Sequence, residues 1–478
     1  MLSQKLLSLA LLLPFSKAAE TILGVYIFSR HGDRTSKATP PTVLTDLGYS
    51  EVFASGTWFR NQYIANGSTS QIYNIESDIV KQSQIVASAP LDDVLMPSCL
   101  GFLQGLYPPV GPTLGSQKLR NGTVVEVPLS GYQIIPVATV TSGTGSEDAA
   151  WLQGSGNCAK AIISSNNYFS SPEYTALLNS TMGFYSNLNP VVNSTFTATQ
   201  NSFLNAYSMF DYLNVAEIHN TTIPYSDLVT NDTLFQLRTL ADTHEYNLAY
   251  NASDPIRAIT GATIAAEVVQ ALNATVTGAG KTPINIQFGA YGGFQSFFGL
   301  ANLTSANPDF YGIPDYASTM TFELFTNAPP SPFPSPDQLG VRFLFHNGTT
   351  GNNSVPVPYP LFGSSNTTMA WNDFVAGMGK FSIGSQEAWC QACGNSTGVC
   401  ASATASTSPS SGGAAKGTGS GSGSGGISKA VAGVIGAFVT LAVILGIEGL
   451  VMLVAGLRLV KKNRLSAGAR EGAVAPKA

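Results

Sequence analysis

The sequence has few charged side chains: they make up 11% of its 478 residues, and the formal net charge is −5. A chain so poor in lysine and arginine offers no basic surface for a phosphate backbone, which excludes nucleic-acid binding. Hydrophobic residues make up 44% of the chain, which excludes a disordered protein. The length allows at least one large core and predicts two lobes.

Cysteine and histidine are also scarce, with five cysteines and four histidines. The motif CQAC, from Cys390 to Cys393, has no second Cys or His pair at zinc-ligand spacing, so it is a weak indication of a zinc or redox site. The other cysteines are Cys99, Cys158 and Cys400. Five cysteines fit an oxidising compartment, where they would form two disulfides and leave one free thiol. The sequence leaves the pairing open.

The N-terminus predicts secretion. Residues 1–19 have the layout of a signal peptide, with one lysine, a leucine-rich run from Leu6 to Leu13 and small residues before the expected cleavage point. The alternative is a buried N-terminal helix. Thirteen Asn-x-Ser/Thr sequons predict N-glycans on an extracytosolic surface. They begin at Asn66, Asn121, Asn179, Asn193, Asn220, Asn231, Asn251, Asn273, Asn302, Asn347, Asn352, Asn366 and Asn395.

The C-terminal part of the chain predicts a membrane anchor. Residues 401–427 are rich in serine and glycine, cannot bury apolar area and predict a flexible stalk. Residues 428–460 contain an uncharged apolar run from Ala430 to Ile447 and predict one transmembrane helix. Glu448 follows this run, and its carboxylate either extends toward the headgroups or contacts a partner helix.

Basic residues directly after the predicted span set its orientation. Lys461, Lys462 and Arg464 lie in the tail 461–478, and the positive-inside rule places that tail in the cytosol. We therefore expect a single-pass type I membrane protein of the secretory pathway, at the cell surface, with residues 20–400 as its extracellular or lumenal ectodomain.

The ectodomain has the pattern of an α/β sheet domain. The apolar run Ile22–Phe28 predicts a strand buried on both faces, and Thr45 is placed to cap the helix after it. A helix-rich middle follows, in which Asp254 is a possible cap. Further strand-like runs then return, and together the pattern predicts one sheet interrupted by a helical cap over roughly 145–280. These runs are Ile284–Tyr291, Ser318–Phe325 and Val341–His346.

The stretch SRHGDRTS, from Ser29 to Ser36, directly follows the first predicted strand. Ligands of open α/β sheets bind beyond the carboxyl ends of the strands. Arg30 and Arg34 would offer guanidinium groups to the oxygens of a phosphate monoester, and an uncharged His31 would attack its phosphorus in line. Gly32 would let the backbone approach the anion.

By composition alone a structural role is the stronger reading of this motif. The two arginines would then pair with carboxylates such as Asp33, and His31 would be an ordinary loop histidine. The other three histidines, His219, His244 and His346, show no pattern that favours a site role.

The wider sequence resembles the histidine acid phosphatases, the branch of fungal phytases and prostatic-type acid phosphatases. The signature RHGDR and six further stretches carry the resemblance, and they follow the family's order over most of residues 21–400. The stretches are Arg30–Arg34, Leu44–Tyr63, Gly101–Pro109, Leu237–Asn251, Ile256–Asn273, Tyr316–Phe325 and Val341–Gly348.

The resemblance implies an α/β/α sandwich with an inserted helical cap. It also implies hydrolysis of phosphomonoesters through a phosphohistidine, with no metal and no cofactor. His31 would be the nucleophile, and Arg30 and Arg34 would bind the phosphate of a phosphomonoester or another small anion.

The family pattern breaks at three positions, apart from Ser36, which replaces a proline of the signature. Ala87 aligns with a third phosphate-binding arginine, and Tyr291 and Gly292 align with a His-Asp pair whose aspartate protonates the leaving group. Glycine has no side chain to donate a proton, and an unperturbed tyrosine titrates near 10. General acid catalysis typically contributes about 10²- to 10⁴-fold in rate, so the loss predicts an impaired enzyme.

Four carboxyl groups are considered as replacements for the missing acid, and the sequence places none of them near a leaving oxygen. They are Asp33, Asp92, Asp93 and Glu323. Two functions therefore remain: an extracytosolic phosphomonoester hydrolase with an incomplete catalytic set, and an inactive pseudophosphatase that serves as a membrane-anchored binding or surface glycoprotein.

Overall fold

The computed structural model describes residues 20–140, 157–219, 226–351 and 353–401. The chain divides into two units, Met1–Ser408 and Pro409–Ala478, and all described residues belong to the first. The predicted signal peptide, transmembrane helix and cytosolic tail, and all of the predicted stalk except its first residue, lie outside the described residues. Within the described residues, no helix is both long and apolar enough to span a bilayer.

A mixed sheet forms the centre of the ectodomain, with the order β10-β8-β7-β1-β6-β2-β5 and β9 beside β8. The central strand β1 runs parallel to β6 and antiparallel to β7. The strands are β1 (Thr21–Ser29), β2 (Ile85–Pro90), β5 (Val137–Val140), β6 (Ile284–Phe288), β7 (Thr319–Thr326), β8 (Leu339–His346), β9 (Val357–Tyr359) and β10 (Thr368–Ala370).

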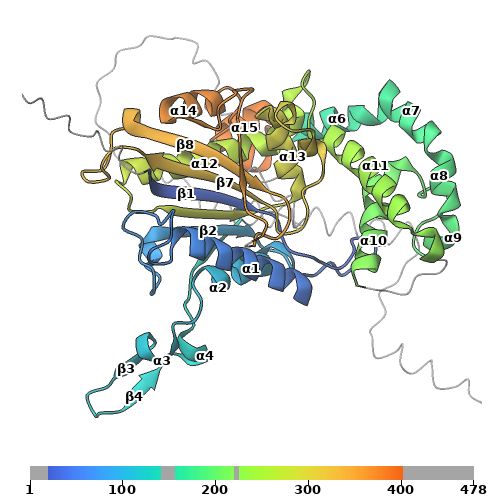
Figure 1. The fold of residues 1–478 in the computed structure, drawn as a ribbon. Helices are drawn as coiled ribbons and strands as arrows, with labels where there is room; N and C mark the ends of the chain where they lie inside the picture. Colours follow the sequence, from blue (N-terminus) through green and yellow to red (C-terminus); the bar gives the residue numbers. More distant parts are fainter. Residues whose placement is uncertain (1–19, 141–156, 220–225, 352, 402–478) are drawn as a thin grey trace, which may run out of the picture. The chain divides into compact units, whose positions relative to one another are not determined.

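Helices cover both faces of this sheet (Figure 1). On one face, Ile27 of β1 shares an apolar cluster with Phe59 and Phe102. On the other, Phe28 packs against Phe294 with ring centroids 4.9 Å apart. Neighbouring residues of a strand point to opposite faces, so β1 is buried on both, as its unbroken apolar run predicts. The helices are α1 (Asp46–Tyr63) and α2 (Leu95–Leu106) on the first face, and α12 (Ile259–Thr277), α13 (Tyr291–Leu300) and α14 (Trp371–Gly379) on the second.

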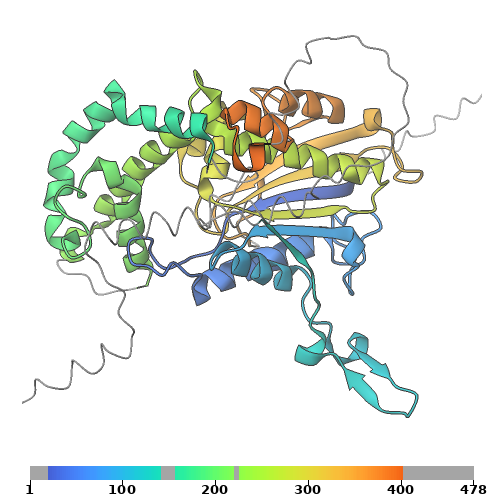
Figure 2. The same cartoon turned by 180° about the vertical axis from the view of Figure 1, so that it is seen from behind.

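The cap has an apolar core of its own, in which Tyr185, Phe203, Leu213 and Leu237 are fully buried. Its helices form one group in Figure 2. They are α6 (Ala159–Asn166), α7 (Pro172–Ser180), α8 (Met182–Asn187), α9 (Asn189–Val192), α10 (Ala206–Ile218) and α11 (Asn231–Ala249).

The cap ends earlier than the expected boundary near residue 280. The helix α12 carries Ile264, Val268 and Leu272 at i, i+4 spacing, and this stripe packs on Leu23 of the central strand. The helix therefore belongs to the sandwich. The sequence could not show this, because an apolar stripe at this spacing can cover either a sheet or other helices.

Of the predicted ends of helices and strands, the start of α1 agrees with the structure and two others differ. Thr45 caps α1, since its hydroxyl accepts the Gly48 N–H at 3.1 Å. The strand expected at Ile284–Tyr291 ends earlier, at Phe288, and Tyr291 instead begins α13. Asp254 precedes a short 3-10 turn, and its side chain makes no cap bond there.

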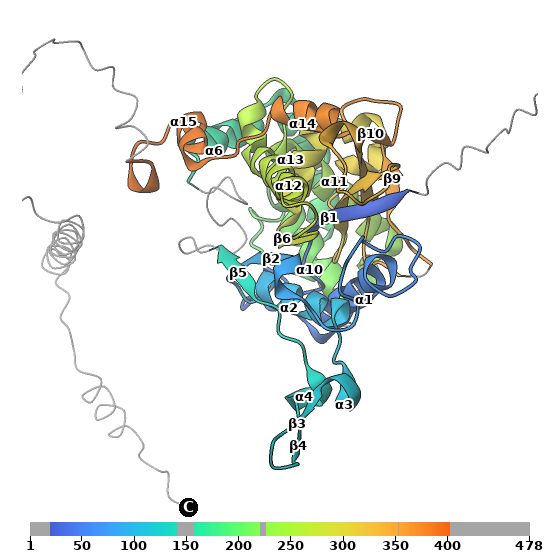
Figure 3. The ribbon, with the colours of Figure 1, turned by 90° about the vertical axis from the view of Figure 1, so that its left-hand side faces the viewer.

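A small two-stranded arm lies between β2 and β5 in the chain. Figures 1 and 3 both show it extending away from the layer of α1 and α2. It consists of α3 (Gly111–Leu114), β3 (Ser116–Lys118), β4 (Val124–Glu126) and α4 (Pro128–Gly131).

The cysteine pairing that the sequence leaves open is defined in the structure. Cys158, next to α6, is bonded to Cys393 of α15 (Gln386–Cys393), and Cys390 is bonded to Cys400. Cys99 is a buried free thiol. Both cysteines of the CQAC motif are thus engaged in disulfides, which leaves no thiolate there for zinc or redox chemistry.

The two disulfides close loops of very different length, with sequence separations of 235 and 10 residues. Removing the long-range bond with Cys158→Ala and Cys393→Ala should lower the free energy of unfolding by about 2–4 kcal/mol, because an unfolded chain gains more freedom when a longer loop opens. Cys390→Ala with Cys400→Ala is the matched control with the smaller expected loss. Denaturant unfolding of both variants measures this, and a larger loss from the control pair would contradict the reasoning.

Candidate functional site

The motif loop begins where β1 ends. The Gly289 N–H donates to the Ser29 carbonyl at 3.0 Å, so the end of β6 lies directly beside it. Arg30, His31 and Arg34 are each 4% exposed or less. The loop therefore occupies the carboxyl edge of the central strands, as the sequence predicts, and its charged side chains are almost wholly removed from water.

Gly32 is needed for a reason other than the expected one. A Cβ there would lie 2.1 Å from the Gly48 carbonyl oxygen, so the loop backbone packs directly on the first turn of α1. The Gly32 N–H also donates to the Ser98 hydroxyl of α2 at 3.3 Å. Glycine thus allows the loop backbone to pack against the helix here.

His31 has a defined orientation. Its Nδ1 lies 2.7 Å from the Gly32 carbonyl oxygen. A carbonyl only accepts hydrogen bonds, so Nδ1 carries the proton and a neutral ring keeps its lone pair on Nε2. The Tyr316 ring packs beside the imidazole in a tilted arrangement, with ring centroids 5.5 Å apart. This is the tautomer that an Nε2 nucleophile requires.

Arg30 lies between aromatic rings. Its guanidinium carbon is 4.6 Å from the centre of the Tyr316 ring and 5.4 Å from that of Tyr291. One of its N–H groups donates to the Pro314 carbonyl. Cation–π contact stabilises the charge in this dry site and leaves the planar group in position to bind an anion.

Arg34 forms a buried ion pair with Asp211 of the cap helix α10. Its Nη2 is 2.9 Å from Asp211 Oδ1, and its Nη1 donates to Oδ2 at 3.3 Å. The same Oδ2 accepts from the Ser36 hydroxyl at 3.0 Å and from the Lys37 N–H at 2.9 Å. The Tyr207 hydroxyl accepts from Nη2 at 2.9 Å.

Asp211 thus receives from the motif loop the set of donors that a bound anion would receive. Burial alone would lower the pKa of Arg34, but the neighbouring tyrosines and Asp211 outweigh it and raise the pKa above its ordinary value. The guanidinium is therefore fixed in its charged form, with a carboxylate already bound to it.

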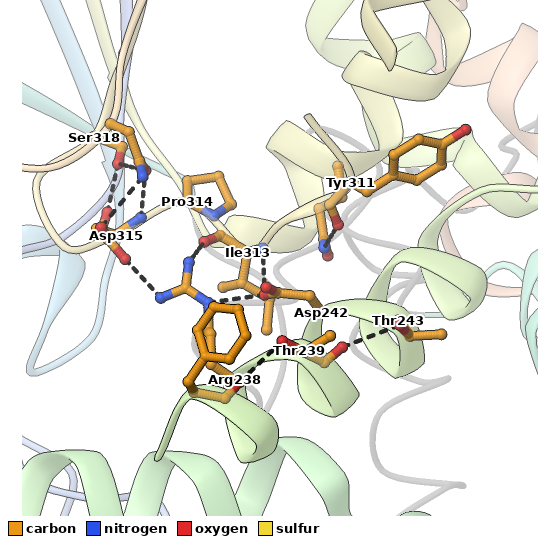
Figure 4. A network of polar contacts seen from close by, with 12 residues as sticks. Arg238, Thr239, Asp242, Thr243, Tyr311, Ile313, Pro314, Asp315 and Ser318 are labelled. Atoms are coloured by element: carbon orange, nitrogen blue, oxygen red, sulfur yellow. Dashed lines mark hydrogen bonds and ion pairs between the residues drawn. The ribbon is translucent and has the colours of Figure 1, made fainter. Parts of the chain in front are cut away.

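A second arginine of the cap holds the loop that carries Tyr316. Arg238 of α11 donates to Asp242 at 2.9 Å and to Asp315 at 2.8 Å, and also to the Ile313 carbonyl (Figure 4). Asp242 in turn accepts the Ile313 N–H at 2.8 Å. This network fixes the loop from Ile313 to Ser318, and with it the ring beside His31.

The three positions where the family pattern breaks have different surroundings. Tyr291 contacts Arg30, as above, and its hydroxyl donates to Glu245 at 2.7 Å. Gly292 has open space where a Cβ would stand. Ala87 is 2% exposed inside β2, in the apolar cluster with Phe59, so its side chain lies in the core rather than beyond the strand end where a phosphate ligand belongs.

The four carboxyls considered as replacement acids are mostly engaged elsewhere. Asp92 accepts backbone N–H groups at the start of α2, Asp93 is exposed, and Glu323 pairs with Arg342. Only Asp33 lies in the motif loop. It is fully buried, and one of its oxygens accepts from Thr45 at 2.5 Å and from His219 at 2.6 Å.

In the part of the chain that the structure describes, cavities border these residues on two sides. A cavity of about 310 Å³, here the Arg30 cavity, is lined by Arg30, Glu51, Asp211, Arg238, Asp315 and Tyr316 among others. A cavity of about 350 Å³, here the Gly292 cavity, includes Lys37, Glu245, Arg257, Tyr291 and Gly292. His31 is not among the lining residues of either cavity. Within the described residues, no group of His, Cys, Asp or Glu side chains could hold a metal ion.

Sequence reasoning missed the partners that come from other elements. His219 was expected to be unremarkable, yet its Nε2 bonds to Asp33. Asp211, Tyr316 and Glu51 were not singled out at all. One signal was available: Asp211 is the single acid within the mostly apolar stretch Tyr207–Ala216, and a buried acid needs a cationic partner.

Comparison with known proteins agrees with the resemblance. The family model described as histidine phosphatase superfamily (branch 2) matches residues 36–346, which begins just after the RHGDR motif. No curated protein matches the chain.

Solved structures of phytases share the fold. The phytase from Citrobacter braakii has a TM-score of 0.51 at 13% identity and aligns over 78% of this chain and 99% of its own. The Klebsiella sp. ASR1 phytase has a TM-score of 0.51 at 12% identity, over 76% of this chain and 95% of its own. The Hafnia alvei phytase has 0.50 at 10%, over 79% and 98%. At these identities the likeness concerns the fold alone.

The Arg34–Asp211 pair makes a direct test of anion binding possible. Asp211→Asn should lower the free energy of unfolding by about 3–5 kcal/mol, because a buried guanidinium then lacks its countercharge. Inorganic phosphate should restore part of the melting temperature, since an anion that binds only the folded chain stabilises it.

Asp242→Asn is the matched control for this experiment. It removes a cap carboxylate from Arg238, outside the motif loop, so phosphate should not restore its stability. Thermal unfolding of both variants with and without phosphate measures the difference. Equal rescue of the two variants would mean that Arg34 is not the anion site.

Proposed function

The chain belongs to the histidine phosphatase superfamily (branch 2), and from this we propose that it hydrolyses phosphomonoesters through a covalent phosphohistidine at His31. The mixed α/β fold with its central sheet is that of phytases. The observation that supports His31 as nucleophile is the bond from Nδ1 to the Gly32 carbonyl, which leaves the lone pair on Nε2.

In this reaction Nε2 of His31 attacks phosphorus as the bond to the leaving oxygen breaks, and the leaving oxygen takes up a proton. Water then attacks the phosphohistidine, giving inorganic phosphate, and the lone pair returns to Nε2. Arg30, held by aromatic rings rather than by a carboxylate, neutralises the phosphoryl oxygens.

The same site contains features that slow the reaction. Arg34 is bound to Asp211, so phosphate has to displace a carboxylate before it gains this guanidinium. The first turn of α13, which begins with Tyr291 and Gly292, contains no acidic residue of its own. Esters whose leaving group is acidic need little protonation, so an aryl phosphate is the substrate on which His31 is tested most directly.

The second candidate function is an inactive pseudophosphatase. The occupied Arg34 favours it, because an internal carboxylate can make the anion site purely structural. In that case the ectodomain serves as a binding or surface glycoprotein.

We also propose that the protein acts outside the cytosol, as a type I membrane protein of the secretory pathway. The signal-peptide layout, the sequons and the apolar C-terminal run support this. The two disulfides support it as well, since such bonds persist in oxidising compartments.

An assay with an aryl phosphate separates the two candidate functions. The purified glycosylated chain should release phosphate across acidic to neutral pH, and His31→Ala should abolish the release, because the phosphoryl group then has no nucleophile. Asp93→Asn is a suitable control, since that exposed carboxyl contacts nothing in the site. Turnover no greater than that of His31→Ala would leave the pseudophosphatase as the function.

A further inference from the structure

The Arg30 cavity gives a ligand access to the Arg30 guanidinium, the group expected to bind phosphate. Three carboxyl groups line it: Glu51, Asp211 and Asp315. A group that donates a proton has to be in its acid form, and a carboxylate paired with arginine is held in its ionised form. The three carboxyls therefore differ in what they can do.

Two of the three are paired with arginine. Asp211 is bound by Arg34 at 2.9 Å, and Asp315 by Arg238 at 2.8 Å. Glu51 has no arginine or lysine within ion-pair distance among the residues that the structure describes. It is therefore the carboxyl of this cavity that can exist as an acid.

Glu51 is held close to the nucleophile by two contacts of its helix. One carboxylate oxygen, Oε2, accepts the Asp33 N–H at 2.8 Å, and Asp33 is two residues beyond His31. One turn earlier in α1, Gly48 packs against Gly32 with backbone contact. The other oxygen, Oε1, is not needed for either contact.

We propose that Glu51 is the leaving-group acid of this chain, in place of the carboxyl that the start of α13 lacks. This inference rests on the proposed phosphohistidine reaction. As Nε2 of His31 bonds to phosphorus and the ester bond breaks, the Glu51 carboxyl gives its proton to the departing oxygen. The resulting carboxylate then takes the proton from the water that attacks the phosphohistidine, which restores the acid and releases inorganic phosphate.

The electrostatic surroundings of Glu51 agree with this role. Burial is the main influence and raises its pKa above the ordinary value. The charges of Asp33 and Asp315 raise it further, whereas the Asp33 N–H and the charge of Arg30 lower it. A general acid works while it is protonated, so hydrolysis of an ester that needs the proton falls as the pH rises through this pKa.

The other carboxyls near the motif are less suited. Asp33 is absent from the lining of the Arg30 cavity, and its Oδ2 is bonded to Thr45 and His219. Glu245 lines the other cavity and accepts the Tyr291 hydroxyl. Because Glu245 is also a partly buried carboxyl beside the site, Glu245→Gln is the matched control.

The test compares an aryl with an alkyl phosphate for Glu51→Gln in the full chain. Gln keeps the bond from Asp33 but has no acidic proton. We expect the alkyl kcat/KM to fall by about 10²-fold or more and the aryl value by less than about tenfold, since only the alkyl leaving group depends on protonation. The fall of the alkyl rate toward higher pH should disappear as well, and Glu51→Asp should recover part of both effects.

Each other outcome contradicts the inference in a recognisable way. Equal losses on both esters would assign Glu51 a structural role, and a selective alkyl loss in Glu245→Gln would identify that residue as the acid. Activity that needs His31 but is unchanged by Glu51→Gln would overturn this inference alone. Absence of His31-dependent turnover in the parent chain would overturn the proposed function as well. Melting temperatures show whether Glu51→Gln is folded, and if it is not, the pH profile of Glu51→Asp decides.

Discussion

The buried ion pair between Arg34 and Asp211 is the interaction on which the site depends. It joins the loop after the central strand to a helix of the cap, and both side chains are almost fully removed from water. Separating them would leave two charges in a medium of low dielectric, which costs several kcal/mol per ion. The pair therefore stabilises the contact between the cap and the motif loop.

The tyrosines around this pair follow from the same constraint. The faces of Tyr291 and Tyr316 contact the Arg30 guanidinium, and Tyr316 also contacts that of Arg34, so the rings reduce the cost of burying these charges without adding negative charge. The result is a site that has charge to offer to a phosphate and that excludes water until a ligand enters. The Arg238 network keeps the loop of Tyr316 in place, so the position of the ring beside His31 also depends on the cap.

Much of the fold was predictable because local sequence determines it. The apolar run of β1, the cap at Thr45 and the return of strands near the end all depend on neighbouring residues. The predicted end of the cap near residue 280 was too late, because the apolar stripe of α12 fits a sheet as well as a helix. The predicted end of the strand β6 was also too late, because Tyr291 suits either the last position of a strand or the first turn of a helix.

The site was predictable only where its residues are consecutive. Arg30, His31 and Arg34 lie together because they share one loop, whereas Asp211 is 177 residues away from Arg34 in the chain and meets it only through the docking of α10. The sequence indicates that a backbone or ligand comes close to Gly32, but it does not indicate that the Gly48 backbone does so. Glu51 went unnoticed because a single acid on an amphipathic helix has the pattern of an ordinary solvated side chain.

The disulfides have a consequence for the C-terminal end of the ectodomain. Cys400, next to the last described residue, is bonded to Cys390 in α15, and Cys393 in the same helix is bonded to Cys158 beside α6. A covalent path therefore leads from the C-terminal end of the ectodomain to the first helix of the cap without passing through the sheet. The last residues of the ectodomain are thus covalently connected to the cap through two disulfides, as well as to the edge of the sheet through the backbone that precedes α15.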